Sequence, residues 1–382
     1  MAFYINETLY FDFYLNGYQL PVTVGNINSF VIVYNVYDQL PAIRLDIIDN
    51  KGLFQDGSLT DGSILSVMIG KNPDEAAKNV MEFQLVGVPD EKKETTRTTY
   101  LLYGVLHKPR LWKCVEPLAI KGTSNQALQT LASKNKLSFD GTITQDEMVW
   151  LNGLGTYCDF IDYIVDHGYS TTGSCMNSVI TPSSKLIYKD INDLQPKYGL
   201  TNISSNQNKQ YSLETFPYSE VQFVNKAGVS NFYYGYQNGV TRYSIDGSIQ
   251  QFNDITVTKQ DSVMLNVNKN IYNETGIVRN ELLTFDIGNT HPFWTKAYYQ
   301  NKRFRSLNSI KATVYVKQRT PIEVLDKIKL DFMNPNANEV KQSQASYWIV
   351  ESKTLAISKQ HYIEKFVLST TGKSLDLYNT TF

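Results

Sequence analysis

The stretch KGTSNQALQTLASKNKLSF, residues 121–139, changes the period of a chain whose other patterned segments alternate like β-strands. Thr123 or Ser124 can cap a helix, because a hydroxyl at this position accepts a hydrogen bond from the free N–H groups of the first turn. The apolar residues behind this cap recur at helical spacing and form one stripe: Ala127, Leu128, Leu131 and Ala132. The stretch therefore predicts a short amphipathic helix inside a β-rich chain.

A second helix is predicted from Thr156 to Gly168, after a segment that contains Trp150. Gly168 is well placed as a left-handed terminator. The acidic residues Asp159, Asp162 and Asp166 occupy the solvent side of this helix. Its apolar stripe is expected to be buried and comprises Tyr157, Phe160, Ile161, Ile164 and Val165.

Residues 1–118 indicate six or seven short strands, which is typical of a small barrel or sandwich. Asn16-Gly17 between two alternating runs is a strong type I′ hairpin signal. Residues 80–88 and 98–106 are interpreted as a strand pair. The charged run from Asp90 to Glu94 between them is expected to be a solvated hairpin tip.

The second half of the chain is less regular until residue 309. Residues 171–220 are polar with little pattern, and residues 220–300 contain short β stretches that suggest an inserted module. Residues 309–371 form a last β unit whose layout resembles that of the first. This likeness favours either an internal duplication or the general similarity of antiparallel β domains.

The charge balance argues against a protein that grips nucleic acid with a broad basic face, since 36 basic and 37 acidic residues leave a net charge of −1. A pore through which DNA passes without binding stays possible. Cys114, Cys158 and Cys175 have no metal-ligand spacing and are interpreted as reduced thiols of a protein assembled in the cytosol. No signal peptide is recognisable, and no run of about 18 apolar residues predicts a membrane span.

No catalytic, cofactor-binding or metal-binding residue is predicted, and an enzyme is not expected. The four histidines are scattered (His107, His167, His291 and His361). Cys158 and His167 would lie on opposite sides of one helix. Lys302-Arg303-x-Arg305, near the aromatic stretch 293–299, could contact DNA or a partner, but a loop packing on its own barrel is favoured.

Three segments together resemble the baseplate hub proteins of phage tails, a family that includes the T-even hub and the base of type VI secretion spikes. The first is the helix from Thr123 to Ala132, followed by Lys136-Leu137-Ser138-Phe139. The second is Trp150 followed by Thr156-x-x-x-Phe160-Ile161-x-x-Ile164-Val165. The third is Tyr347-Trp348-Ile349-Val350, followed by Gln360-His361-Tyr362 and Phe366-Val367-Leu368.

The resemblance implies a mainly β fold with a small α+β part. It comprises two tube-like antiparallel β-barrels, a helical linker module and a β-rich insertion. The expected parts are the first barrel (1–118), the helix-containing module (119–205), the inserted module (206–305), and the second barrel with a C-terminal tail (306–382). The first strands of the inserted module could belong to the second barrel.

The resemblance also implies a function at the tail tip. Three chains would form a homotrimeric hub that adapts the six-fold tail tube to a three-fold central spike and surrounds part of the DNA channel. The expected partners are the tail tube protein, the central spike protein and other baseplate proteins, with DNA passing transiently and without specific binding. The hub would be assembled in the host cytoplasm and carried in the virion. The alternative is a distal-tail or receptor-recognition module that binds host surface carbohydrate through the Tyr- and Asn-rich strands at 220–300.

Overall fold

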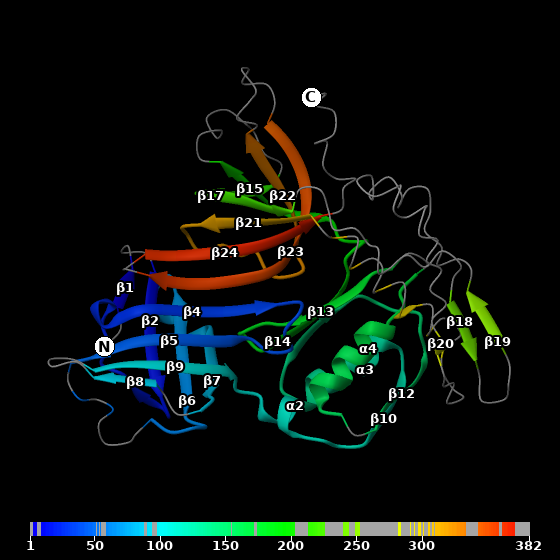
Figure 1. Ribbon diagram of the computed structural model, residues 1–382, viewed down its shortest axis with the longest axis horizontal. Helices are drawn as coiled ribbons and strands as arrows, with labels where there is room; N and C mark the ends of the chain where they lie inside the picture. Colours follow the sequence, from blue (N-terminus) through cyan, green and yellow to red (C-terminus); the bar gives the residue numbers. More distant parts are fainter. Residues whose placement is uncertain are drawn as a thin grey trace.

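The computed structural model confirms a mainly β chain with a small α+β part (Figure 1). It describes residues 3–5, 9–50, 52, 54, 59–87, 90–93, 98–153, 155–171, 174–202, 213–225, 240–243, 249–252, 282–283, 291, 294, 297–298, 301, 305, 308, 310–333, 343–358 and 361–370. In these residues, no helix combines the length and the apolar character needed to cross a membrane.

Sixteen of the described strands form one mixed sheet. The strands from the first third of the chain are β1 (Phe3–Ile5), β2 (Leu9–Leu15), β3 (Tyr18–Gln19), β4 (Ile27–Asn35), β5 (Ala42–Asp49), β6 (Ile64–Gly70), β7 (Val80–Leu85), β8 (Asp90–Lys93) and β9 (Thr98–Leu106). The later strands are β15 (Pro196–Asn202), β16 (Glu214–Tyr218), β17 (Glu220–Asn225), β21 (Ile310–Val316), β22 (Lys327–Met333), β23 (Ser343–Ser358) and β24 (His361–Thr370).

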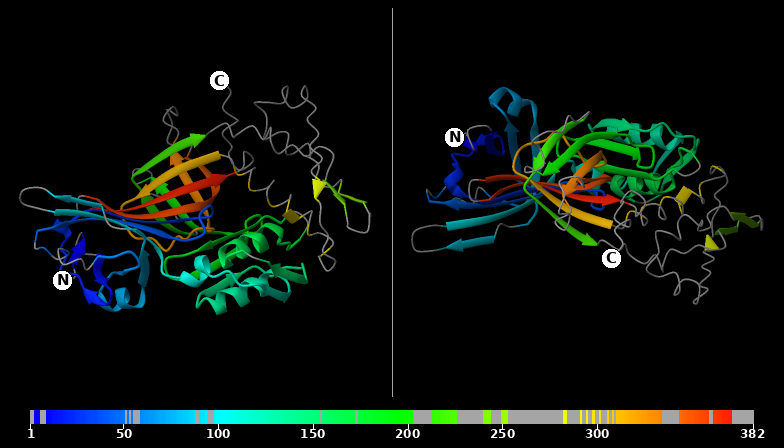
Figure 2. Two further views of the ribbon diagram at one scale, coloured as in Figure 1. Left: turned by 60° about the horizontal axis from the view of Figure 1, so that its bottom comes forward. Right: turned by 90° about the horizontal axis from the view of Figure 1, so that it is seen from above.

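This sheet encloses two separate apolar cores, and we call the strands around each core a β unit. In the first β unit, strands β2, β4, β5, β6, β7 and β9 pack side chains such as Phe11, Phe30 and Phe83 together. In the second β unit, strands β15, β21, β22, β23 and β24 surround Trp348 and Phe366. Figures 1 and 2 show the second unit, coloured green and orange to red, beside the blue first unit.

Strand pairing in the second β unit follows a ring. From β23 the ladders run through β22 and β15 to β16, and in the other direction through β24 and β21 to β17. Only Ser219 separates β16 from β17, and its N–H donates to the Tyr315 carbonyl on β21 at 2.8 Å. The two series of paired strands therefore end at β16 and β17, which are consecutive in the chain.

The helical module packs beside the β units, on the right in Figure 1. It contains α3 (Ser124–Lys134) and α4 (Tyr157–His167), the short α2 (Pro109–Lys113), and the pair β10 (Leu118–Gly122) and β12 (Met148–Asn152). A three-stranded sheet completes it, with β14 (Lys185–Asp190) between the parallel β11 (Ser138–Gly141) and the antiparallel β13 (Met176–Ile180). The remaining elements are α1 (Pro73–Lys78), the 3-10 turn η1 (Val24–Asn26), and the small sheet of β18 (Val240–Tyr243), β19 (Ile249–Phe252) and β20 (Leu282–Leu283).

Both predicted helices are confirmed, and of the two candidate caps of the first helix the structure uses Thr123. Thr123 and Thr156 are the N-caps, and each forms a reciprocal capping box with the third helical residue, Gln126 or Asp159. Both apolar stripes are buried. Gly168 does follow α4, but the prediction that it is left-handed is wrong, because its φ of −66° and ψ of 140° are extended. Glycine is needed here for space, since a Cβ would lie 1.9 Å from the Tyr188 hydroxyl oxygen.

The predicted turn at Asn16-Gly17 is confirmed by positive φ angles of 50° and 85°. The predicted charged tip is wrong for Asp90–Lys93, which form strand β8 along β9. The low pattern of residues 171–220 was also misleading, since β13, β14 and β15 lie there. Most of residues 226–290, the predicted turns at 238–239 and 246–247, and the tail 371–382 lie outside the described residues. The four-part division of the chain stays a prediction.

Candidate functional site at the crossing of the two β units

Strand β23 crosses from one β unit to the other. Its first half pairs with β22, up to Ile349 opposite Lys327. Its second half pairs with β4, from Ser352 opposite Asn35. Against β24, the register of β23 shifts between Val350 and Ser352, so Glu351 is a bulged residue at the change of partners. A bulge bends its strand and increases the local twist, which lets one strand serve two curved sheets.

The Glu351 side chain is held by both β units. Lys311 on β21 forms an ion pair with its carboxylate, and the Tyr37 hydroxyl donates a hydrogen bond to the same oxygen. Lys311 Nζ also donates to the Tyr37 hydroxyl oxygen at 2.9 Å. The Glu351 carbonyl accepts the Val36 N–H at 3.0 Å. Backbone and side chain together fix the bulge against the loop between β4 and β5.

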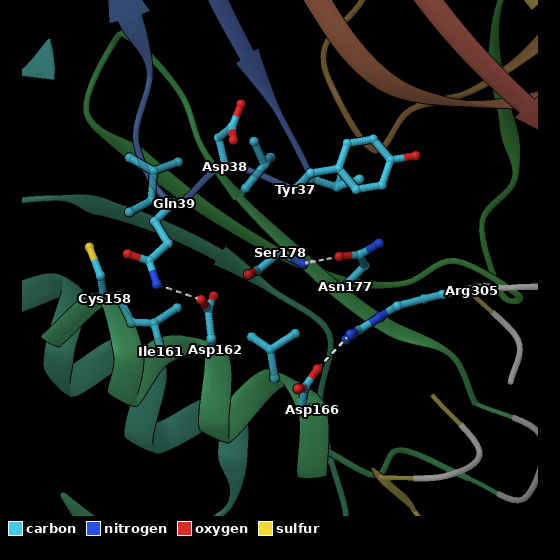
Figure 3. A pocket seen from close by; sticks show the side chains of 14 residues that line it. Tyr37, Asp38, Gln39, Cys158, Ile161, Asp162, Asp166, Asn177, Ser178 and Arg305 are labelled. Atoms are coloured by element: carbon cyan, nitrogen blue, oxygen red, sulfur yellow. Dashed lines mark hydrogen bonds and ion pairs between the residues drawn. The ribbon is translucent and has the colours of Figure 1, made fainter. Parts of the chain in front are cut away.

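That loop also contacts the helical module (Figure 3). Asn35 Oδ1 accepts the N–H groups of Tyr37 and Asp38, both at 2.7 Å, and thereby holds a tight turn. At the end of this turn, Gln39 Nε2 donates to Asp162 on α4 at 2.7 Å. The loop from Asn35 to Gln39 thus links the two β units and the helical module.

A pocket of about 210 Å³ lies between this loop, α4 and β13 (Figure 3). Asp38, Asp162 and Asp166 contribute carboxylates to its lining, and Arg305 lines it beside Asp166. Arg305 forms an ion pair with Asp166 at 2.5 Å and donates to the Met176 carbonyl at 2.7 Å. Of the predicted basic and aromatic stretch, Arg305 therefore packs inside the chain, on the helical module rather than on a barrel. Lys302 and Arg303 lie outside the described residues.

A second charged cluster lies two residues further along β23. The Lys353 side chain is 4% exposed, and its Nζ lies 3.5 Å from the Glu364 carboxylate and 4.0 Å from that of Glu323. It also donates to the Ile322 carbonyl at 2.8 Å and the Thr320 carbonyl at 3.3 Å. We call Tyr34, Thr320, Glu323, Lys353, Tyr362 and Glu364 the crossing cluster.

Glu364 is fully buried and satisfied by hydroxyl and backbone donors. Thr320 donates to the Glu364 carboxylate twice, from its hydroxyl at 2.6 Å and from its backbone N–H at 3.1 Å. The Tyr362 hydroxyl donates to the same carboxylate at 2.8 Å. Tyr34 on β4 donates its hydroxyl to Glu323 at 2.6 Å. Burial first, and the neighbouring carboxylate second, raise the pKa of Tyr34 well above its ordinary value, so this phenol stays a donor.

The cluster forms the wall of a cavity of about 510 Å³. Arg319 lies in this cavity and forms an ion pair with Glu75 on α1 at 2.6 Å. The turn from Thr181 to Ser183, between β13 and β14, closes another side. Three parts of the chain therefore meet around this space.

The described residues contain no group of three His, Cys, Asp or Glu side chains close enough to hold a metal ion. Cys158 and Cys175 are buried, and burial raises the pKa of each thiol to about 12, which suppresses the reactive thiolate. Cys158 lines the pocket of about 210 Å³. The His167 ring instead stacks on the Trp294 ring, with 4.1 Å between the ring centres.

One contact surface was missed by the sequence reasoning. Five helical positions at i, i+3, i+4, i+7 and i+11 face the helical module: Trp294, Ala297, Tyr298, Asn301 and Arg305. Asn301 Nδ2 donates to the carbonyls of Asp166 and Gly168, and its Oδ1 accepts the Met176 N–H at 2.9 Å. The spacing of these residues was a helical signal, but the surrounding Tyr- and Asn-rich sequence was interpreted as β.

Comparison with known proteins gives a result at the level of structure only. No protein-family model matches the sequence, and no curated protein matches it. The tail protein of Neisseria meningitidis MC58 has a TM-score of 0.53 at 10% identity, over 96% of this chain and 97% of the other. The 43 kDa tail protein of prophage MuSo2 from Shewanella oneidensis also scores 0.53 at 10% identity, over 95% and 97%.

The chain has the fold of phage tail proteins. A further match, the E. coli c3393 protein of the type VI secretion system, scores 0.48 at 7% identity, over 95% of this chain and 78% of the other. It is described as structurally similar to the T4 tail proteins gp27 and gp5. The predicted resemblance is confirmed as a likeness of fold to phage tail proteins, on the two matches with TM-scores of 0.53. The carbohydrate-binding alternative rests on residues 220–300, most of which lie outside the described residues.

Proposed function

We propose that this chain is a structural, non-enzymatic component of a phage tail tip, namely the baseplate hub. In this proposal three copies form a ring that adapts a six-fold tail tube to a three-fold central spike. The ring surrounds part of the channel through which DNA leaves. It is assembled in the host cytoplasm and remains in the virion baseplate with the tube, spike and other baseplate proteins.

The observation that carries the proposal is the pair of β units on one continuous sheet, in a chain that matches two tail proteins over almost their whole lengths. A trimer of a chain with two similar units presents six units around one axis. This pseudo-six-fold arrangement suits a tube on one side, while the three-fold symmetry of the chains suits a spike on the other.

The shared sheet also offers a surface for the channel. One transverse row of paired residues crosses seven strands from β9 to β17: Val105, Ala42, Val33, Thr354, Lys365, Tyr315 and Glu220. Strands lie about 4.8 Å apart, so this row extends roughly 30 Å. Its side chains are half-buried or exposed and lie on the face opposite the two cores. We assign this outer face to the channel.

The charges on this row suit a channel that does not retain DNA. Lys365 and Glu220 are its only charged members, one of each sign. The neighbouring row adds Arg44, which lies 6.0 Å from the centre of the Tyr103 ring. A surface that holds DNA needs several cations that neutralise phosphates together, and the row from Val105 to Glu220 carries one, Lys365.

Light scattering after size-exclusion chromatography tests the assembly. A mass near three times the 43.5 kDa chain, unchanged by salt, is expected for the isolated chain. If trimerisation needs the partners, mixing with the tube and spike proteins should give a larger complex that contains three copies of this chain. A chain that stays monomeric in both settings, or that binds neither protein, would contradict the hub assignment. Clearing of a cell-wall suspension by the purified chain would contradict the non-enzymatic role.

A further inference from the structure

The crossing cluster divides the two apolar cores along one face of the crossing strands. On β24, the inward residues in order are Tyr362 of the first core, Glu364, and Phe366 of the second core. On β23, Ile357 belongs to the first core and Val350 to the second, with Lys353 between them. A buried ion pair thus occupies the boundary, where a continuous apolar face would otherwise join the cores.

The pairing inside the cluster depends on the strand register. Lys353 lies opposite Tyr34 on β4 and Phe366 on β24. Its ammonium therefore reaches the loop carbonyls of Thr320 and Ile322 and the carboxylate of Glu364 together. A slip of two residues would keep the inward face inward but would place Lys353 where Leu355 or Val350 packs. There its charge would be buried without these partners.

A buried ion pair in this position adds little net stability, but it disfavours every strand register in which the two charges are separated. Taking both charges out of water offsets most of their attraction, whereas separating them leaves an uncompensated buried charge. The apolar contacts between the β units allow alternatives more readily. The apolar residues are similar in kind on both sides, and the cavity of about 510 Å³ beside the cluster leaves space for movement.

We propose that Lys353 and Glu364 are positioning residues that fix the register of the β23–β24 hairpin and, through it, the angle between the two β units. Glu323 and Tyr34 extend this device from the hairpin to the loop after β21 and to β4. The inference concerns the geometry of one chain. It goes beyond the proposed function and does not depend on it.

The test measures the distance between the units with two spin labels. The labels are placed at Tyr18→Cys in the first β unit and Gln222→Cys in the second, both exposed, with Cys114→Ser to remove the half-buried thiol. An excess of unlabelled chain isolates distances within one chain. The test variant is Lys353→Met with Glu364→Gln, which removes both charges at once. The matched control is Lys365→Met with Glu82→Gln, the same chemical changes outside the cores.

The expected result is a test variant that keeps its strand circular dichroism and cooperative unfolding while its distance distribution shifts or broadens. The control should superimpose on the parent. A folded test variant whose distribution also superimposes on the parent would overturn the proposal. Should the test variant lose cooperative unfolding, Glu364→Gln alone replaces it, because the amide removes the ion pair with Lys353 while its oxygen still accepts from the hydroxyls of Thr320 and Tyr362. The same two outcomes then decide.

Discussion

Lys311 on β21 and Glu351 on β23 form an ion pair at the residue where β23 leaves β22 and joins β4. The Glu351 side chain is 10% exposed, so its charge depends on Lys311 and on the Tyr37 hydroxyl for compensation. The bulge and its ion pair come from three places far apart in the sequence. They hold the two β units where the sheet passes from one to the other.

Replacing Glu351 with Ala should lower the free energy of unfolding by about 2–3 kcal/mol, because Lys311 then loses its charged partner in a partly buried place. Tyr37→Phe removes only one hydroxyl contact and should cost about 1 kcal/mol. The control is Lys317→Met, which changes the exposed lysine that directly follows β21, the strand of Lys311. It should change the free energy of unfolding by less than about 0.5 kcal/mol. Urea unfolding measures all three, and equal effects for Glu351→Ala and Lys317→Met would refute the role of the pair.

The two capping boxes give a prediction for the helical module. Thr123→Ala and Thr156→Ala should each destabilise the fold by about 1 kcal/mol, since the cap accepts an otherwise free N–H of the first turn. Thr130→Ala is the matched control. Its exposed hydroxyl donates to the Gln126 carbonyl inside α3, and Ala has the higher helix propensity. Thermal unfolding should show a loss for both caps and none for Thr130.

Sequence reasoning succeeded where the deciding contacts are local. Thr156 and Asp159 are three residues apart and exchange the two capping hydrogen bonds within one turn. Asn16 and Gly17 set their own backbone angles. Signals of this range are complete in a single sequence window, so the two helices, the cap of the first and the first hairpin could be predicted.

The crossing could not be predicted, because its residues meet only in the folded chain. Tyr34 and Glu323 are 289 residues apart, and Tyr37 and Glu351 are 314 apart. In the sequence, Glu351 and Lys353 look like solvent-facing positions of one alternating strand, although both are buried. Asp90–Lys93 was misjudged for a related reason, since charged residues suit a strand that pairs at a sheet edge.

Asn301 should be among the most sensitive polar residues of the helical module. Its amide joins the last carbonyls of α4 to the start of β13, and it is fully buried. Asn301→Ala leaves these groups without partners and should cost about 2–3 kcal/mol. The control Asn28→Ala removes one exposed contact with Asp46 and should cost less than about 0.5 kcal/mol. Urea unfolding that gives the same small loss for both would contradict this role.

Asp140 should make the helical module sensitive to acid. Partial burial raises the pKa of Asp140, but hydrogen bonds and charges from Lys189 and Lys185 lower it by more, so that it lies below the ordinary value of 3.8. A carboxyl whose folded pKa is depressed stabilises the fold above the unfolded pKa. This contribution is lost as the pH falls from 3.8 through the lower folded value. Asp140→Asn should therefore flatten the decline of stability with acid, whereas Asp193→Asn, an exposed control, should leave it unchanged.

The outer face assigned to the channel can be tested by making it basic. Val33→Lys, Ala42→Lys and Thr354→Lys together add three cations to adjacent positions of one row. In the trimeric assembly this variant should bind duplex DNA with a salt slope of roughly −2 to −3, since each phosphate contact contributes about −0.9. If the row lines a closed channel, a linear duplex can thread into it and a closed circle cannot.

The control Gln129→Lys, Thr130→Lys and Ser133→Lys places the same charge on the exposed side of α3 and should bind linear and circular DNA alike. Equal retention of circles and linear DNA by the row variant would place this face on the outside of the assembly.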